Sequence, residues 1–424
     1  MSNLVPNGWR RVQLGDVVEP RSSNVDKKTH EGEIPVQLCN YTDVYYNNRI
    51  TSRVSFMDAT AKEREIERFT LAVDDVIITK DSETPNDIAV PAYVSEDLRG
   101  VVCGYHLTIL RPYQGKSNGE YLAHLFQLPS IQHHFYVLAN GITRFGLTAD
   151  AISNAPLVLP PLSEQKKIAA ILTSVDEVIE KTQAQIDKLK DLKTGMMQEL
   201  LTCGVGVDGK PHMEFKDSPV GRIPKAWEVK SIGDLFQVQL GKMLSKQSKV
   251  GDCPLPYLGN KNVQWGKFDL TNIETMDFSE KEILKFSLKR GDLLMCEGGD
   301  VGRCAIWNNE IGNCYYQKAL HRLRPINNEY DSFLLMEYMK FAKQNGALVD
   351  YISQTSIAHL TKEKLVSIPV PVPPREEQRK IVSALKAVTF KLQTGQKKLD
   401  KTSALKKALM QDLLTGKVRV KVDS

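Results

Sequence analysis

Long apolar runs are missing from this 424-residue chain. No stretch of eighteen apolar residues occurs, so we expect no membrane-spanning helix. The N-terminus has no basic segment followed by an apolar one, so we expect no secretory leader. The seven cysteines are odd in number, and no two are spaced C-x-x-C. This pattern argues against a disulfide framework or a zinc site and predicts reduced thiols in the cytoplasm.

Motifs that carry catalysis or hold a cofactor are also missing. Gly241-Lys242 lacks the earlier glycine and the following Ser or Thr of a G-x-x-x-x-G-K-[ST] loop, and the glycines at 298, 299 and 302 do not fit G-x-G-x-x-G. There is no Asn-Pro-Pro-aromatic tetrad for amino-methyl transfer and no paired acidic-x-Lys nuclease motif. The adjacent His133 and His134 point apart on any regular element, which makes them poor metal ligands. We therefore predict no catalytic residue, no metal site and no cofactor bound by this chain.

Positive charge is scarce outside the C-terminal end. The whole chain has a net charge of +5, whereas residues 375–424 contain thirteen basic and five acidic residues and account for +8 by themselves. A protein that held DNA by bulk electrostatics alone would be more basic throughout. Any nucleic acid would therefore have to be bound by local contacts.

The sequence contains an internal repeat. At an offset of 213 residues, the segment 147–172 falls on 360–385 without a gap, and 197–202 falls on 410–415. Upstream the match is weaker and needs small gaps. It includes Trp9 with Trp227, FTLAVDDVIIT from Phe69 with FSLKRGDLLMC from Phe286, and Leu110-Arg111-Pro112 with Leu323-Arg324-Pro325. The order is therefore variable half, helix, variable half, helix.

Two long helices follow the proline segments. After Pro161, apolar residues recur at alternating steps of four and three as far as Leu200, with Lys193 in the one missing place, and Cys203-Gly204 ends the helix. The second helix is predicted from about Arg375 to Thr415, with Gly395 as its weakest point and a seam of Ile381, Leu385, Val388, Leu392, Leu399, Leu405, Leu409 and Leu413. Such a heptad pattern is typical of a coiled coil, and each helix would be roughly 60 Å long. We expect the two helices to pair antiparallel; the alternative is that each is a lone surface helix of its own domain.

The two halves have the mixed texture of small α+β domains. DDVIIT from Asp74 and GDLLMC from Gly291 predict short buried strands, and short helices are expected at 118–128 and 331–344. The proline-dotted segments PLVLPP and IPVPVPP belong at a sheet edge. The predicted fold class is α+β, with two globular domains joined by two long antiparallel coiled-coil helices in an internal pseudo-twofold repeat. The predicted divisions are 1–155, 156–204, 205–368 and 369–424.

Polar loops precede the proline segment in both halves. Their side chains suit contacts with base edges and phosphates, although a solvated turn is the plain alternative. The candidates are Asn140, Thr143 and Arg144 in the first half, and Gln354, Thr355, Ser356 and His359 in the second. Secondary candidates follow the matched buried strands, at Lys80-Asp81-Ser82 and Glu297-Gly298-Gly299.

The proline-helix junctions resemble a known family. LPPLSEQKKIAAIL with MMQELLT, and VPPREEQRKIVSAL with LMQDLLTGKVRV, are similar to the repeated conserved regions of Type I restriction-modification specificity subunits. The resemblance covers the whole chain, since that family has the same order of variable halves and conserved helices. It implies that the halves are target recognition domains, each reading one part of a split, asymmetric site in double-stranded DNA, and that the paired helices fix the gap.

The resemblance also implies partners. The family assembles with two methylation subunits and with restriction subunits, and these hold the S-adenosylmethionine, ATP and Mg sites. The family's DNA-contacting positions lie in its variable halves, so no motif transfers them to single residues here. The rival hypothesis is a coiled-coil scaffold whose halves bind proteins rather than DNA, and a bifunctional enzyme is a third possibility that the missing motifs disfavour.

Overall fold

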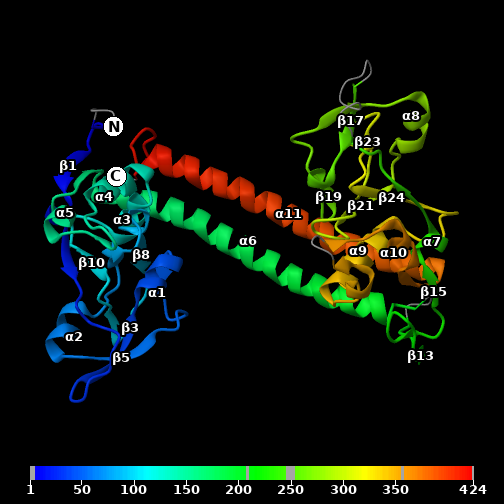
Figure 1. Ribbon diagram of the computed structural model, residues 1–424. Helices are drawn as coiled ribbons and strands as arrows, with labels where there is room; N and C mark the ends of the chain where they lie inside the picture. Colours follow the sequence, from blue (N-terminus) through cyan, green and yellow to red (C-terminus); the bar gives the residue numbers. More distant parts are fainter. Residues whose placement is uncertain (1–4, 207–209, 245–253, 355–357, 423–424) are drawn as a thin grey trace. The chain divides into compact units, whose positions relative to one another are not determined.

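The structure is a computed structural model that describes residues 5–206, 210–244, 254–354 and 358–422, with the backbone alone at 353–354. The chain divides into two compact units, one made of Met1–Ala184 with Lys397–Ser424 and the other of Gln185–Gln396. Each unit holds one globular half together with one end of each of the two long helices (Figure 1). Both halves mix helices with sheets, so the α+β prediction is confirmed.

The first unit is built on two sheets. A five-stranded sheet has the order β2 (Val18–Ser22), β10 (Leu107–Pro112), β6 (Val76–Thr79), β8 (Pro91–Val94), β4 (Arg49–Ile50). A three-stranded sheet has the order β5 (Met57–Ala61), β3 (Ile34–Cys39), β9 (Val101–Cys103). The helices of this half are α1 (Tyr41–Tyr46), α2 (Glu63–Phe69), α3 (Gly119–Phe126), α4 (Pro129–Leu138) and α5 (Ala149–Ser153).

Within its described residues, the second unit repeats this plan with four strands in the larger sheet. Its larger sheet has the order β16 (Phe236–Leu240), β24 (Leu320–Pro325), β21 (Leu293–Cys296), β22 (Cys304–Ile306). Its smaller sheet has the order β20 (Glu274–Asp277), β17 (Pro254–Leu258), β23 (Tyr315–Tyr316). The helices are α7 (Ile232–Leu235), α8 (Glu280–Phe286), α9 (Ser332–Gln344) and α10 (Lys362–Ser367).

The remaining strands form two-stranded ladders. The proline segments are β12 (Pro156–Leu159), paired with β1 (Arg10–Gln13), and β27 (Pro369–Val372), paired with β15 (Glu228–Ser231). In a two-stranded ladder every strand is an edge, so the predicted edge position is confirmed. The other pairs are β7 (Asp81–Ser82) with β11 (Phe145–Gly146), β13 (Phe215–Lys216) with β14 (Ile223–Pro224), β18 (Val263–Gln264) with β19 (Lys267–Phe268), and β25 (Ser353–Gln354) with β26 (Ala358–His359).

The central strands β6 and β21 are the predicted buried strands, and each of them is buried along its whole length. Successive side chains of a strand point to opposite faces of the sheet, so such a strand contributes to two cores. In β6, Ile77 belongs to a core shared with the three-stranded sheet, whereas its neighbours Val76 and Ile78 join a core that includes α3, α4 and both long helices. The second unit divides β21 in the same way.

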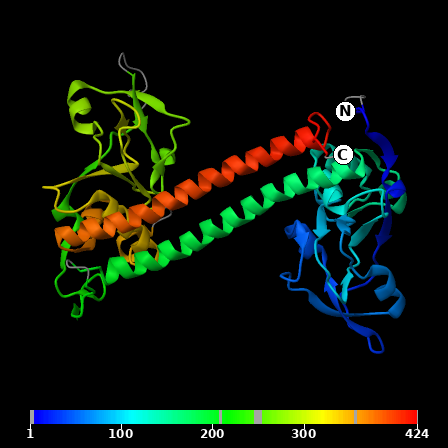
Figure 2. The ribbon, with the colours of Figure 1, turned by 180° about the vertical axis from the view of Figure 1, so that it is seen from behind.

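The two long helices are α6 (Leu162–Thr202) and α11 (Arg375–Leu413), close to their predicted bounds. They pack together: the first unit contains the N-terminal part of α6 beside the C-terminal part of α11, and the second unit contains the opposite ends. Figures 1 and 2 show the two helices side by side and antiparallel, as the sequence predicts. Among the described residues, no helix is long and apolar enough to cross a membrane.

The predicted seam of the second long helix includes one residue that is exposed and leaves out one that is turned inward. Leu405 is 53% exposed, because six residues separate it from Leu399 and the heptad phase is lost between them. The inward position is taken by Lys406, whose side chain is 13% exposed and whose ammonium lies 2.7 Å from Asp176 of α6. At Gly395 the two helices approach closely, since a Cβ there would lie 3.0 Å from the side chain of Ile186.

Candidate nucleic-acid interface

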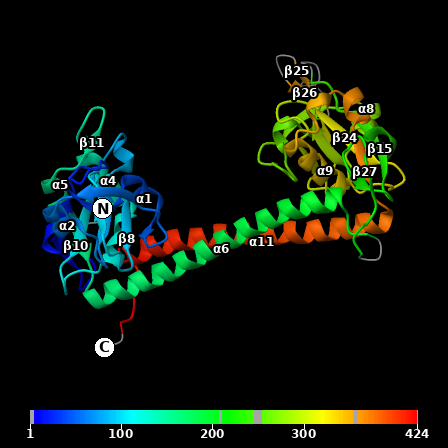
Figure 3. The same cartoon turned by 90° about the horizontal axis from the view of Figure 1, so that it is seen from below.

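In the first half, both groups of candidate residues come together on one small ladder. Strand β11 of the 140–145 loop, labelled in Figure 3, belongs to this ladder. It pairs with β7, which contains Asp81 and Ser82, and the amide of Leu147 donates to the carbonyl of Lys80 over 3.0 Å. Mutual backbone hydrogen bonds between Asn140 and Gly146, at 3.1 and 2.9 Å, close the loop. The closure requires Gly141, because a Cβ there would lie 1.8 Å from the carbonyl oxygen of Arg144.

Arg144 is the best-placed candidate of this loop. Its Nε lies 3.5 Å from Oδ1 of Asp81, while 52% of its side chain stays exposed. The same oxygen of Asp81 contacts Nδ1 of His106 over 2.5 Å. Burial lowers the pKa of His106 despite the nearby carboxylate, so a neutral ring donates this hydrogen bond to Asp81. The guanidinium is thereby held in place with donors left for a ligand.

The other candidates of the first half differ in exposure. Thr143 and Asn140 are exposed, although the Asn140 amide donates to the Leu138 carbonyl at 3.1 Å. Lys80 lies over the ring of Tyr105, 5.4 Å from its centre, and reaches the Ser23 carbonyl at 3.5 Å.

Ser82 is turned inward. It is 8% exposed, and its hydroxyl accepts a hydrogen bond from Tyr41 over 3.2 Å. Its side chain therefore supports the ladder and does not present its hydroxyl at the surface.

The second half brings the corresponding segments together. Hairpin β25–β26 pairs Ser353 with His359, and His359 in turn bridges to Gly298 (Figure 3). The amide of Leu360 donates to the Glu297 carbonyl at 2.8 Å, which matches the contact between Leu147 and Lys80 in the first half. Gly298 permits this approach, because a Cβ there would lie 3.1 Å from the His359 ring. Of the remaining candidates, Thr355 and Ser356 lie outside the described residues, as does the side chain of Gln354.

Side chains of different chemistry surround the two ladders. In the first half they are Tyr41, Lys80, Tyr105 and His106, with Tyr105 45% exposed and packed on His106. In the second half the amide of Asn260 donates to the Gly298 carbonyl at 3.0 Å, and Arg303 donates to the Asn260 carbonyl at 3.0 Å. Apart from Lys80, the sequence analysis did not predict these neighbours. The repeat offers one signal for them, because Tyr105-His106 aligns with Lys318-Ala319 directly before two otherwise matching strands.

The conserved-looking Glu-Gln pair of the repeat has a structural role. Gln165 accepts from the amide of Asn118 and donates to the Pro160 carbonyl, each at 3.0 Å. Gln378 does the same with Asp331 at 3.3 Å and Pro373 at 3.0 Å. Each glutamine thus ties the start of a long helix to the N-cap of the short helix, α3 or α9, that packs on it.

The glutamate of each Glu-Gln pair lies at the start of one long helix and binds the segment that follows the end of the other long helix. Glu377 is fully buried and accepts from the amides of Val205 and Gly206 and from Nε1 of Trp227, all at 2.8 Å. His212 completes the site at 2.9 Å. The corresponding Glu164 accepts two hydrogen bonds of 2.7 Å from Arg419.

Gly204 makes room for the Glu377 site. It ends α6 with φ of +69°, the left-handed conformation that glycine favours, and a Cβ there would lie 2.2 Å from the Glu377 carboxylate.

The comparisons with known proteins agree with this organisation. The family model of the Type I restriction modification DNA specificity domain matches residues 6–191 and again 224–401. The chain is 26% identical to the putative type I restriction enzyme MjaX specificity subunit of Methanocaldococcus jannaschii, over 98% of this chain and 95% of that protein. It is 23% identical to the EcoKI specificity subunit of Escherichia coli, over 82% of this chain and 75% of that protein.

Solved structures with the same fold include a type I restriction-modification S subunit from M. genitalium. That likeness has a TM-score of 0.60 at 15% identity and covers 97% of each chain. A second, from work on the assembly and conformational transition of a type I R-M system, has a TM-score of 0.54 at 20% identity and covers 98% of this chain and 100% of that one.

Proposed function

The chain belongs to the Type I restriction modification DNA specificity family, and on that premise we propose how its halves and helices divide the reading of DNA. It is the sequence-specific DNA-binding subunit of such a system, and the scaffold alternative has no support from the comparisons. Each globular half reads one part of a bipartite, asymmetric site in double-stranded DNA. The paired helices act as the ruler that sets the gap between the two parts.

One observation carries this proposal. The loop before the proline strand packs on the turn after the central strand in both halves, yet the side chains at that place differ. The same frame therefore presents different side chains in the two copies, as expected of two domains that recognise different DNA sequences. These side chains are Arg144, Lys80 and Tyr105 in the first copy, and Asn260, Arg303 and His359 in the second. Arginine can bind guanine through two donors, and asparagine can do the same for adenine.

Partners complete the function. We assign two methylation subunits and the restriction subunits as partners, with S-adenosylmethionine, ATP and Mg bound by them, and we place the chain in the cytoplasm with its DNA. The chain itself then recognises and recruits, without catalysis. The low overall charge supports this division, because phosphate contacts from partners would supply affinity that the two halves lack.

Selection from randomised duplex DNA tests the reading role. The chain with a methylation partner is expected to enrich two short motifs separated by a gap of fixed length, whereas the partner alone enriches none. Failure to enrich any split motif would overturn the proposal.

The ruler role has its own test. Inserting one heptad into both long helices adds about 10 Å, or roughly three base pairs, to the enriched gap and leaves both motifs unchanged. A seven-residue insertion at the exposed turn of Gly115 is the control and should leave the gap alone. An unchanged gap in the heptad variant would refute the ruler.

A further inference from the structure

The two units contain the same junction between a globular half and the long helices, and the two copies are filled differently. In the first unit the junction leaves a cavity of about 20 Å³, room for about one water molecule. In the second unit it opens into a cleft of about 750 Å³. Seven lining positions correspond at the 213-residue offset of the repeat: Glu120/Phe333, Ala123/Met336, His124/Glu337, Gln127/Lys340, Thr173/Lys386, Asp176/Thr389 and Glu180/Gln393.

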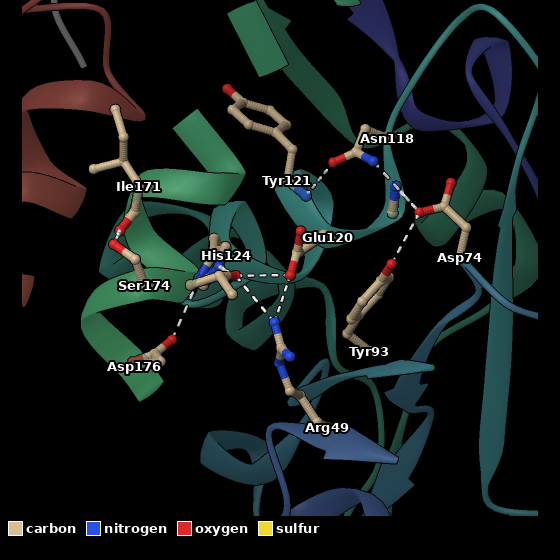
Figure 4. A network of polar contacts seen from close by, with 12 residues as sticks. Arg49, Asp74, Tyr93, Asn118, Glu120, Tyr121, His124, Ile171, Ser174 and Asp176 are labelled. Atoms are coloured by element: carbon tan, nitrogen blue, oxygen red, sulfur yellow. Dashed lines mark hydrogen bonds and ion pairs between the residues drawn. The ribbon is translucent and has the colours of Figure 1, made fainter. Parts of the chain in front are cut away.

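Arg49 fills the cavity of the first unit. It enters from the edge strand β4 and donates to Glu120 at 2.5 Å and to Thr173 at 3.2 Å (Figure 4). Thr173 also donates to Glu120 at 2.7 Å and contacts His124 at 3.1 Å. The plug is therefore a cation seated in an acidic pocket.

In the part of the second unit that the structure describes, no cation takes the corresponding place. The β18–β19 hairpin lies against its edge strand β22, where the Gly266 amide donates to the Cys304 carbonyl at 2.9 Å, and Trp265 of that hairpin lines the cleft from this edge. The residue that replaces Glu120 is Phe333, and Lys386 replaces Thr173 and lies over the Phe333 ring at 5.1 Å. The acid Asp176 becomes Thr389, and Gln127 becomes Lys340. The sign of the charge has reversed between the copies.

The cleft has an excess of positive charge. Seven basic residues line it against three acidic ones, Asp292, Asp331 and Glu337. Lys193 is paired with Glu337 at 2.8 Å and Arg324 with Asp292 at 2.6 Å. Five basic residues then remain without an ion-pair partner among the residues that the structure describes: Lys289, Arg290, Lys340, Arg375 and Lys386.

Buried polar groups that lack partners also line the cleft. The Thr389 hydroxyl and Oε2 of Glu337 have no hydrogen-bond partner within the described ranges, and Glu337 is only 3% exposed. Buried polar groups without a partner are unfavourable, so a ligand that offers hydroxyl groups would satisfy them. Trp265 adds a partly buried aromatic side chain to the wall.

We propose that this cleft is a binding site for a small polyphosphate anion of nucleotide size. The volume lies within the range of about 300–1,000 Å³ that small-molecule sites occupy. Several unpaired cations around one cleft suit an anion with closely spaced charges better than the single charge of each DNA phosphodiester. The proposal does not depend on the reading of DNA by the two halves.

Isothermal titration of the full chain, in buffer without divalent cations, tests the site with ATP, inorganic tripolyphosphate and uncharged adenosine. Saturable binding of ATP or tripolyphosphate, with adenosine at least tenfold weaker, is the expected result. Tighter binding of ATP than of tripolyphosphate would identify a nucleotide as the ligand, and equal affinity would identify a polyphosphate; either outcome supports the proposal. No saturable binding of either anion, or adenosine binding as tightly as ATP, overturns it.

Variants place the binding in the cleft. Lys340→Met and Thr389→Asp should each weaken binding about tenfold or more, the first by removing a cation and the second by restoring the acid of the other copy. Lys281→Met, at an exposed position of α8 in the same unit, is the matched control and should bind like the parent chain. If all three variants bind the anion as tightly as the parent chain, the cleft is not the binding site. Displacement of the anion by a non-specific DNA duplex would make the cleft part of a DNA path and would also overturn the proposal.

Discussion

Replacing Glu377 by glutamine tests the structural role of the repeated Glu-Gln pair. Oε1 of Glu377 accepts from the amides of Val205 and Gly206, and Oε2 accepts from Trp227. A glutamine keeps one acceptor oxygen and turns an NH₂ group toward the remaining donor. The least costly arrangement serves both backbone amides and leaves the buried Trp227 indole, 1% exposed, without an acceptor.

The cost follows from burial. Loss of hydrogen bonds to a charged acceptor and an unsatisfied buried donor together amount to about 2–4 kcal/mol. The matched variant is Glu164→Gln in the other copy. Its partner Arg419 has a side chain that is 42% exposed and can be rehydrated, so the expected cost is below about 1 kcal/mol.

Urea unfolding and hydrogen exchange measure the difference. With a slope of about 2 kcal/mol/M, Glu377→Gln should lower the midpoint of the transition of its unit by roughly 1–2 M. Exchange of the Val205 and Gly206 amides should accelerate in this variant and stay unchanged in Glu164→Gln. Equal losses for the two variants, or unchanged protection of both amides in Glu377→Gln, would contradict the assignment.

Arg144→Ala should weaken the recognition of one half-site by about 1–3 kcal/mol and leave the other half-site unchanged, as measured by competition with single-base variants of the selected DNA; equal loss at both half-sites would indicate damaged folding. Gly195→Ala should stabilise the chain by about 0.5–1 kcal/mol in thermal unfolding, because open space surrounds it, whereas Gly395→Ala should lose that gain, since its Cβ would lie 3.0 Å from Ile186. Burial, followed by nearby cations, lowers the pKa of His124 to about 3. An unfolded histidine titrates near 6.5, so protons bind the unfolded chain first and the free energy of unfolding falls below about pH 6.5 by at most about 1.4 kcal/mol per pH unit; His124→Gln should flatten this slope between pH 6.5 and 5.

The sequence predicts the frame well because the frame is periodic. The bounds of α6 and α11, the buried strands β6 and β21 and the edge position of the proline segments all follow from apolar spacing and proline chemistry. Leu405 is the exception, because Lys406 and not Leu405 occupies the seam position. The apolar spacing of one helix does not show which acid of the other helix will pair with a lysine at the seam, and here that acid is Asp176.

The neighbours of the candidate loops could not be predicted in the same way. Tyr41 and Tyr105 contact the segment that pairs with the first loop, and Asn260 contacts the segment that bridges to the second; all three come from parts of the sequence far away. No period or motif joins such residues, because sheet topology brings them together. The loops themselves were found only because they occupy the same place in both copies.

A duplicated chain separates two kinds of residue. Positions that stayed the same, such as Gln165 with Gln378 and the ion pairs Asp75–Arg111 and Asp292–Arg324, make matching contacts that hold each copy in its shape. Changes at such positions damage the frame wherever they occur. Positions that differ between the copies while the surrounding fold stays the same are not needed to maintain that fold, so we expect their differences to serve function. The candidate loops are of this second kind. Exchanging side chains between copies at those places is therefore expected to transfer binding properties without loss of stability.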